Sequence, residues 1–542
     1  MLSTVALEPV YVLVEKWEIC LQAAEILTSQ LFLVKSILHQ AVASRPAGDN
    51  SAPQALPLLE DLETYAETCF ASATKCKELD QTKQSGYWVS LVRRIHKAIG
   101  RESYAVETFY GESLRCIRKY PQALKVFKAA LRYLNAHEYD GETLAGVMVQ
   151  IAYNQYDLNR IDREVKWYQR VLDLGLGRNP ESVDLYGICI SLSYELTHLY
   201  RFEESEVILN RVKTDYSPLQ SRLCNAFGLL YSTREEFSLS EHWLRQGLLL
   251  SPKDPNSLHI NLANLCFKQG RTEEARLVLG RYMRLRGVCA ENRACAMTLQ
   301  ARDCIEANKY EEAGKWLQKA ERLEGKWQVR GYQPARRLLY EGNLAFETGH
   351  YAQAEVHFLA ALASYQELNS LEGQIPISYR LSLVYLLTEQ IAKAESALAP
   401  YLNRPEAQHR LTAFARLFEA QGRIYTCKQA LPEARICLDK ALSIQDQSLP
   451  NTKETARSHS ALGTWELASH RYSQAYEHFT QALLVLGNSG DGAEAYLGLA
   501  EMYRRGEDWE SAKRCLEAGL KPFASLPAHP LAVKLHTQLQ LL

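Results

Sequence analysis

Histidine and cysteine are the side chains in this chain that could hold a metal or carry out nucleophilic chemistry. The 542 residues include 14 histidines and 13 cysteines. They contain no His-Glu-x-x-His sequence and no Cys-x-x-Cys pair, so the usual short metal-binding spacings are missing. Gly487, Gly490 and Gly492 lie close together, but no strand is recognisable before them, as a phosphate-binding loop would require. We therefore expect no enzyme activity, no metal and no cofactor.

A second set of polar side chains is suited to binding another protein. Asparagine amides can both donate to and accept from an extended backbone, and arginine binds carboxylates or phosphates through parallel hydrogen bonds. Such residues recur with few acidic residues at equivalent positions, which favours an acidic segment as the partner. Arginine is, however, also common on any solvated helix face. The candidate partner-binding residues are Asn225, Asn261, Asn264, Arg302, Arg336, Asn343, Arg380, Arg416, Arg423 and Arg457.

A repeated pair of small residues indicates which elements would position that set. Eleven times a small residue is followed twelve residues later by another, with Glu164 as the one large exception, and an apolar residue always stands four residues further on. Small side chains let two helix backbones approach closely, and the apolar side chain fills the space between them. We therefore predict eleven helix hairpins. Their first small residues are Gly111, Ala152, Ser193, Gly228, Ala263, Ala301, Gly342, Ser382, Gly422, Gly463 and Ala500.

This pattern resembles the tetratricopeptide repeat, for example in GNLAFETGHYAQAEVHFLAAL around Gly342 and GRIYTCKQALPEARICLDKAL around Gly422. The resemblance implies an all-α fold, a right-handed α-solenoid (superhelix) of stacked antiparallel helix hairpins. In such a fold each hairpin contacts its neighbours only, and the first helices line a concave groove. The candidate residues would lie on this groove, exposed to solvent.

The repeats depart from the family pattern in two ways. Most units are about 40 residues long, where the family has about 34. Of the two units closest to the family's length, only the first, which starts at Ser221, carries the closing proline, Pro252. The family's carboxylate clamp of paired lysine and asparagine is matched in part by Asn225, Asn261 and Asn264, while its lysines are missing. The superhelical pitch is therefore not predicted.

We expect three parts along the chain. Residues 1–103 form a helical N-terminal cap or docking arm, residues 104–526 the repeat solenoid, and residues 527–542 a C-terminal capping helix. Apolar residues at helical spacing from about Val10 to Ala43 form a helix longer than a cap needs, so self-association through the N-terminal helices is an alternative role. The loop at residues 44–57 is the expected flexible linker.

Charge and composition restrict the partners and the location. The formal net charge is −1, and because general nucleic-acid binding needs an extended basic face, we expect no direct nucleic-acid binding. A local basic surface is still compatible with this charge. No run of about eighteen apolar residues is present for a membrane span. The N-terminus lacks the basic region of a secretory signal. Cysteines at core positions, which are Cys189, Cys224, Cys266 and Cys304, indicate buried free thiols and a cytoplasmic location.

The sequence thus favours a non-enzymatic protein–protein interaction scaffold or adaptor that binds a partner segment in its concave groove. Two alternatives stay open at this stage. One is a ligand- or peptide-responsive regulatory solenoid of a signalling or transcription system. The other is a structural subunit of a large multiprotein assembly, which apolar termini would suit.

Overall fold

The computed structural model describes residues 66–67, 69–71, 73–74, 82–98, 102–137, 139–158, 160–174, 183–212, 217–251, 257–404, 412–448, 451–487 and 489–542. Residues 1–65 of the expected N-terminal cap or docking arm, which include the linker at residues 44–57, lie outside these ranges, as does Pro252. The chain divides into two compact units, residues 1–154 (unit 1) and residues 155–542 (unit 2), which meet within α6 (Gly141–Asp157). The boundaries expected at residues 103 and 526 stay predictions.

Unit 1 contains α3 (Thr82–Ala98), α4 (Tyr104–Cys116), α5 (Tyr120–Ala136) and most of α6. The first repeat hairpin is α4 with α5, and α3 packs against α4. Trp88 and Ile95 of α3 are buried in one apolar cluster with Val106 of α4. Unit 1 is therefore built on the same helix-on-helix packing as the repeats that follow.

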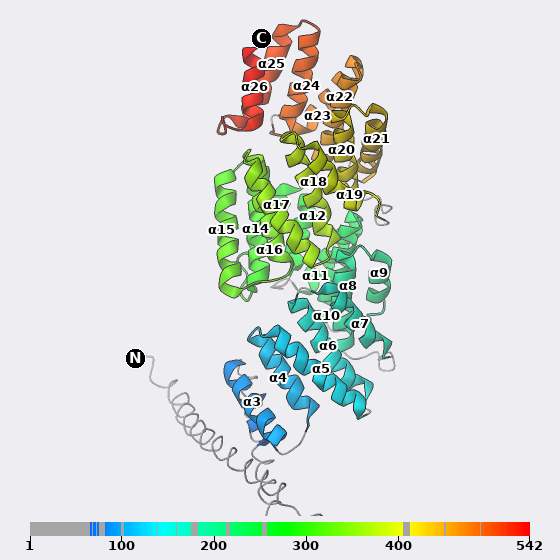
Figure 1. Ribbon diagram of the computed structural model, residues 1–542, viewed down its shortest axis with the longest axis vertical. Helices are drawn as coiled ribbons and strands as arrows, with labels where there is room; N and C mark the ends of the chain where they lie inside the picture. Colours follow the sequence, from blue (N-terminus) through cyan, green and yellow to red (C-terminus); the bar gives the residue numbers. More distant parts are fainter. Residues whose placement is uncertain are drawn as a thin grey trace, which may run out of the picture. The chain divides into compact units, whose positions relative to one another are not determined.

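Unit 2 continues the series of hairpins (Figure 1). Its described residues form helices and no strands, which confirms the all-α right-handed solenoid. The helices are α7 (Ile161–Asp173), α8 (Val183–His198), α9 (Phe202–Leu209), α10 (Ser217–Thr233), α11 (Phe237–Leu250), α12 (Leu258–Lys268), α13 (Thr272–Tyr282), α14 (Ala290–Glu306), α15 (Tyr310–Trp327), α16 (Tyr332–Glu347), α17 (Tyr351–Glu367), α18 (Leu371–Leu387), α19 (Ile391–Leu402), α20 (Thr412–Cys427), α21 (Leu431–Ser448), α22 (Lys453–Ala468), α23 (Tyr472–Leu486), α24 (Gly492–Arg505), α25 (Trp509–Leu520), the short η3 (Lys521–Phe523) and α26 (Pro530–Gln540).

The predicted small residues mark the places where the two helices of a hairpin touch. A Cβ atom added at Gly342 of α16 would lie 2.5 Å from Cδ1 of Phe358 on α17. At Gly463 of α22 it would lie 2.7 Å from Cδ1 of Phe479 on α23. Each glycine meets the apolar residue sixteen positions later, as the spacing predicts. The helix axes are therefore held at a distance that only a very small side chain permits.

Serine replaces alanine at two of the second positions, and its hydroxyl is satisfied within the hairpin. Ser240 Oγ donates to the carbonyl oxygen of Gly228 at 2.7 Å, and Ser205 Oγ donates to that of Ser193 at 3.0 Å. Both hydroxyls therefore bind the backbone of the first small residue across the helix contact. A buried polar group costs little when it is bonded in this way.

The turns inside the hairpins share one backbone conformation. The residue two positions before the second helix has a positive φ, for example 60° at Gln429 and 59° at Glu389. Only Gly270 and Gly349 fill this position with glycine among the described hairpin turns of unit 2. The other turns therefore accept the strain that a non-glycine residue has in the left-handed region.

Unit 2 also contains contacts between hairpins five places apart in the series. His198 Nδ1 of α8 lies 2.8 Å from Glu372 Oε2 of α18, a separation of 174 residues. The backbone N–H of Thr412, which opens α20, donates to Glu235 in the α10–α11 turn at 2.9 Å. The expectation that each hairpin contacts its neighbours only is therefore wrong for unit 2, because successive turns of the solenoid touch.

The C-terminal helix joins the same scheme. Helix α26 packs against α25, and a Cβ atom at Gly349 in the α16–α17 turn would lie 2.5 Å from Cδ of Pro530. His529 stacks on Phe523 with ring centroids 4.4 Å apart, and burial lowers the pKa of His529 to about 4. Helix α26 thus contacts a hairpin far from it in sequence, in addition to covering the last hairpin.

The close helix contact predicts opposite effects for two glycine substitutions. Gly342→Ala should destabilise unit 2 by about 1–3 kcal/mol, because its Cβ would overlap the Phe358 ring. Gly314→Ala on α15 is the matched control, since its Cβ would lie 3.8 Å from Leu344 Cδ2, and it should stabilise by up to about 1 kcal/mol through helix propensity. Urea unfolding followed by circular dichroism measures both. Equal effects would contradict the helix contact.

Substitutions in the two glycine-containing turns test whether α26 packs on the α16–α17 turn. Gly270 and Gly349 have φ of 74° and 80°, so alanine should cost about 1–2 kcal/mol at either position through backbone strain. Nothing lies within 4 Å of a Cβ at Gly270, whereas Pro530 stands in the way at Gly349. Gly349→Ala should therefore lower the unfolding midpoint in urea more than Gly270→Ala does. Identical midpoints would mean that α26 does not rest on the α16–α17 turn in solution.

Candidate functional site

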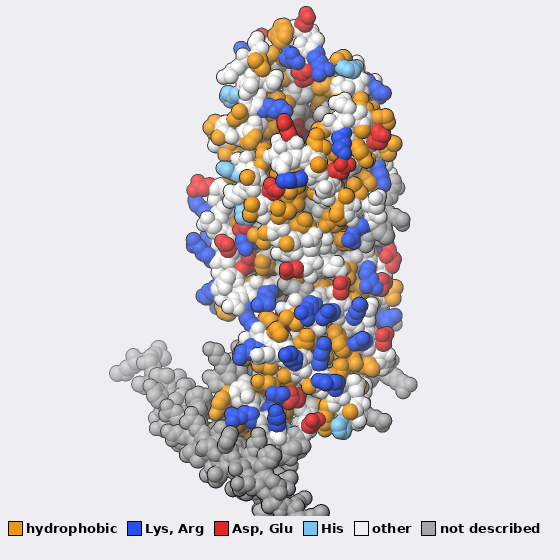
Figure 2. All heavy atoms as spheres, in the orientation of Figure 1, with side chains coloured by type: hydrophobic (Ala, Val, Ile, Leu, Met, Phe, Trp, Pro, Cys, Tyr) orange, Lys and Arg blue, Asp and Glu red, His pale blue; other side chains and the backbone are white. Residues whose placement is uncertain are grey.

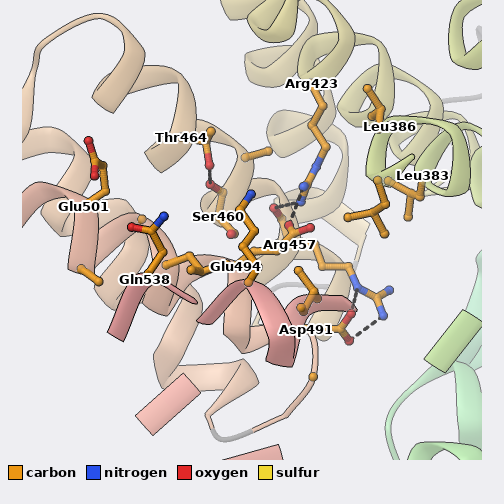
Figure 3. Close-up of a pocket in the computed structure, with 18 of the residues that line it drawn as sticks. Leu383, Leu386, Arg423, Arg457, Ser460, Thr464, Asp491, Glu494, Glu501 and Gln538 are labelled. Carbon is orange, nitrogen blue, oxygen red and sulfur yellow. Dashed lines mark hydrogen bonds and ion pairs between the residues drawn. The ribbon is translucent and has the colours of Figure 1, made fainter. Parts of the chain in front are cut away.

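A pocket of about 500 Å³ lies between the first helices of four consecutive hairpins, α18, α20, α22 and α24, and the C-terminal helix α26. Figure 3 shows the charged residues on the first helices turned toward this space, with Gln538 on the α26 side. The end of α16 and the start of α17 complete the lining through Phe346, Glu347 and Tyr351. The pocket therefore exists because successive turns of unit 2 touch.

The pocket arginines Arg423 and Arg457 are held by carboxylates of their own or nearby helices (Figure 3). Arg423 on α20 lies 2.6 Å from Glu419 and 2.7 Å from Glu494 of α24. Arg457 on α22 lies 2.7 Å from Asp491, just before α24. Burial alone would raise the pKa of Asp491, but the positive charge and hydrogen bond of Arg457 outweigh burial and hold that pKa below its usual value. These pairs join three consecutive hairpins.

The remaining wall of the pocket is mostly apolar. Leu383 and Leu386 of α18 face the space, and Leu531 of α26 lines it as well. Tyr379 presents its ring, since its hydroxyl donates to Glu419 at 3.0 Å. A pocket of this kind, with apolar walls and a few fixed polar groups, is typical of a site that binds a side chain or a short segment.

Three of the ten residues predicted from the sequence line this pocket, namely Arg380, Arg423 and Arg457. The expectation that they are exposed is wrong, because the Arg380 and Arg457 side chains are only 18% and 14% exposed. Arg380 lies 3.5 Å from Glu347, the loosest ion pair among the predicted arginines. The carboxylates that reach these arginines come from their own and from neighbouring helices, which the sequence pattern did not show.

The three predicted asparagines of the early repeats, with Arg302, form internal contacts instead of a free surface. Asn225 is buried, and its amide donates to Tyr194 Oη at 2.9 Å, while Asn261 donates to Asn225 Oδ1 at 2.9 Å. Arg302 donates to Asn264 Oδ1 at 3.2 Å. These bonds link α8, α10, α12 and α14 in sequence order. They therefore support the solenoid along its inner side.

The remaining predicted residues are also half-buried on first helices. Arg336 Nη1 donates to Cys295 Sγ at 2.8 Å, and Arg302 lies 2.8 Å from Glu306. Arg416 pairs with Glu454 of α22. Asn343 lies on α16, outside the pocket. The structure therefore places all ten residues on first helices but brings only three of them together in one cavity.

Sequence reasoning missed a second polar cluster in unit 2. Beside the His198–Glu372 contact, the Tyr332 hydroxyl donates to Glu195 Oε2 at 2.9 Å, and the His198 and Tyr332 rings lie 4.4 Å apart. The partners are separated by 137 and 174 residues, so no local spacing marks them. This cluster joins α8 to α16 and α18.

Hydrogen bonding and charge favour an ion pair between His198 and Glu372 in this cluster. Burial alone would lower the pKa of His198, but the hydrogen bond and charge of Glu372 outweigh burial and raise it. Burial would likewise raise the pKa of Glu372, whereas the hydrogen bond to His198 lowers it to about 2. The pairing therefore favours the protonated form of His198 and the ionised form of Glu372.

The described residues contain neither a membrane-spanning helix nor a disulfide bond. No helix there is both long and apolar enough to cross a membrane. The described cysteines are free thiols, and Cys189, Cys224, Cys266 and Cys304 are buried, as the sequence predicts.

The charged pair predicts a pH-dependent effect of Glu372→Gln. Removing one partner of a charged hydrogen bond should destabilise unit 2 by about 2–3 kcal/mol. Glu372 contributes to the free energy of unfolding above the pKa that it has in the unfolded chain, near 4.5. His198 contributes fully below the pKa that it has in the unfolded chain, near 6.5. The loss of stability should thus be largest near pH 5.5 and shrink as the pH rises through the raised pKa of His198. Urea unfolding of both proteins at pH 5.5 and 8.5 measures it, and a loss that grows with pH would contradict the assignment.

Solved structures with a similar arrangement of helices give the fold a name. A chain of the APC/C hetero-tetramer Cut9-Hcn1 matches with a TM-score of 0.51 at 14% identity, covering 88% of this chain and 98% of that chain. A tetratricopeptide repeat protein from Parabacteroides merdae matches at 0.39 and 17% identity, covering 48% and 93% of the two chains. The human IFIT1 dimer with PPP-AAAA matches at 0.40 and 14% identity, covering 71% and 91%.

Sequence comparison adds no relative to these structures. No family model and no curated protein matches the sequence. The structural likeness, at identities this low, shows the fold alone. Together with the confirmed helix contacts at the predicted small residues, it establishes that this chain has the fold of the tetratricopeptide-repeat solenoids.

Proposed function

We propose that this chain is a non-enzymatic scaffold that holds a segment of a partner protein in the pocket between α18–α24 and α26. The observation that carries the proposal is the pocket itself, about 500 Å³ in volume with apolar walls and fixed charges. Solenoids of helix hairpins expose extended inner surfaces of this kind and bind peptides on them. A cytoplasmic location belongs to the same proposal and is supported by the free cysteines.

The carboxylates of the pocket change the partner that the sequence suggests. An entirely acidic segment would be repelled by Glu347, Asp491 and Glu494, which already neutralise the arginines. We therefore propose a segment of mixed character, with apolar side chains against Leu383 and Leu386. A single acidic side chain would bind Arg380, whose long ion pair is the easiest to exchange.

A second candidate function is a subunit of a large assembly. Several large apolar side chains on the second helices are exposed, among them Leu277 (64%), Val356 (65%), Ile436 (70%) and Leu484 (82%). Exposed apolar side chains on one side of a repeat array are suited to a permanent partner when they adjoin. The likeness to a chain of the Cut9-Hcn1 hetero-tetramer is compatible with such a role.

A matched pair of threonine variants tests the pocket. Thr464 lines the pocket and bonds the carbonyl oxygen of Ser460 at 3.0 Å, so Thr464→Trp should fill the space and exclude the partner segment without breaking an ion pair. Thr537 on α26 makes the same type of bond to Val533 at 2.9 Å but does not line the pocket, so Thr537→Trp should bind as the wild type does. Quantitative affinity purification from the native cell identifies partners of the wild type, and titration then gives the affinity for each variant.

We expect at least a tenfold loss of affinity for Thr464→Trp, which corresponds to about 1.4 kcal/mol. Circular dichroism and urea unfolding serve as folding controls for both variants. Equal affinity of the two folded variants would remove the pocket as the docking site. Partners retained by both would instead favour the exposed second helices and the assembly role.

A further inference from the structure

Positive charge is concentrated in one segment of unit 1, residues 82–137. Residues 82–137 contain eleven lysines and arginines against three glutamates, although the whole chain has a net charge of −1. Helices α3 and α5 contain no acidic residue at all. The near-zero total therefore averages a basic segment, residues 82–137, with an acidic remainder that includes the rest of unit 1, and the charge of the whole chain says little about this surface.

Several cations of unit 1 have no ion pair within the described residues, unlike the arginines of the unit 2 pocket. Six of them are exposed and form no ion pair with a described residue, and these are Arg94, Lys97, Lys119, Lys125, Lys128 and Arg132. In the view of Figure 2, Lys and Arg side chains predominate over α4 and α5. In the unit 2 pocket, by contrast, every arginine of the first helices has a carboxylate beside it.

Three of the unpaired cations form one stripe along α5. Lys125, Lys128 and Arg132 follow at spacings of three and four residues, so they share one exposed face of the helix. The helical rise places them over about 10 Å along the axis. Such a line of positive charges fits a ligand whose negative charges also repeat along a line.

An aromatic cluster stands beside the end of this stripe. Tyr133 stacks on His137 with ring centroids 4.1 Å apart, and Tyr104 meets Tyr139 edge-on at 4.9 Å. His137 is exposed, and the three tyrosines are partly exposed. Proteins bind single-stranded nucleic acid with two elements, aromatic rings on which bases stack and cations that bind the phosphates. Both elements are present at this surface.

We propose that the α5 face of unit 1 binds single-stranded nucleic acid through Lys125, Lys128 and Arg132, with the aromatic cluster taking a base. The exposed face of α5 carries no large apolar side chain, so it lacks the insertion that membrane binding would use. An acidic protein segment would use the cations but has no need of the rings. The proposal is independent of the pocket in unit 2.

The test uses the full chain and a fluorescently labelled oligouridylate of about 20 nucleotides, long enough to cover one site. The variant Lys125→Glu, Lys128→Glu, Arg132→Glu should weaken binding at least tenfold and reduce the salt slope of the affinity by about 2, since about 0.7 counterions are released per phosphate contact. The matched control reverses Lys319, Arg322 and Lys326 of α15, which have the same spacing on an acid-rich helix and should leave binding unchanged. Both sets are exposed, so circular dichroism should show intact folds.

A second variant separates nucleic acid from an acidic protein. His137→Ala should weaken oligouridylate binding several-fold, because one stacking surface is lost, and should leave the binding of polyglutamate of equal charge unchanged. Failure of the wild type to bind oligouridylate would overturn the proposal. The proposal would also be overturned if polyglutamate bound as tightly as oligouridylate and His137→Ala had no effect on binding. That result would assign the surface to an acidic protein segment. Equal effects of the two triple variants would likewise contradict a localised site.

Discussion

Contacts between hairpins one solenoid turn apart are the constraint on which the rest of unit 2 depends. His198 meets Glu372, Thr412 meets Glu235, and Pro530 rests on the turn at Gly349. In an open repeat array the inner faces of the first helices would look onto solvent. Here they look onto other helices, so a polar side chain on that face needs a partner from its own helix, a nearby hairpin or the next turn.

The chemistry of the inner face follows from this closure. A half-buried guanidinium without a counter-charge would be costly, and each arginine of the pocket has a carboxylate within 3.5 Å. The paired charges hold consecutive hairpins in register, and the space left between them and α26 is the pocket. Unit 1 contrasts with this arrangement, because its exposed cations are left for solvent or for a ligand.

The fold could be predicted from the sequence because its decisive contacts are local. Gly342 and Phe358 are sixteen residues apart, and the same spacing recurs in each repeat. The helix contact of one hairpin therefore predicts the same contact in the others. The turn conformation was less predictable, since residues such as Gln429 take a positive φ where glycine would be expected.

The site was predictable only in part, for a physical reason. Helical spacing identifies which residues share a helix face, and three residues of the predicted stripe, Arg380, Arg423 and Arg457, line one pocket. It does not show what they face. Glu494 lies 71 residues from Arg423, and the helix that carries it approaches only when the hairpins stack. Partners brought together by the stacking of hairpins leave no mark in the local pattern.

Hydrogen exchange of the full chain at increasing urea concentration tests the coupling between solenoid turns most directly. If the contacts between turns hold unit 2 closed, α8 and α18 should lose their protection at the same urea concentration, and so should α10 and α20, because neither pair can open alone. Mass spectrometry of peptides from these four helices resolves the order. Protection lost one hairpin at a time from an end, with α8 and α18 opening at different urea concentrations, would show that the hairpins interact with their neighbours only and would contradict the account.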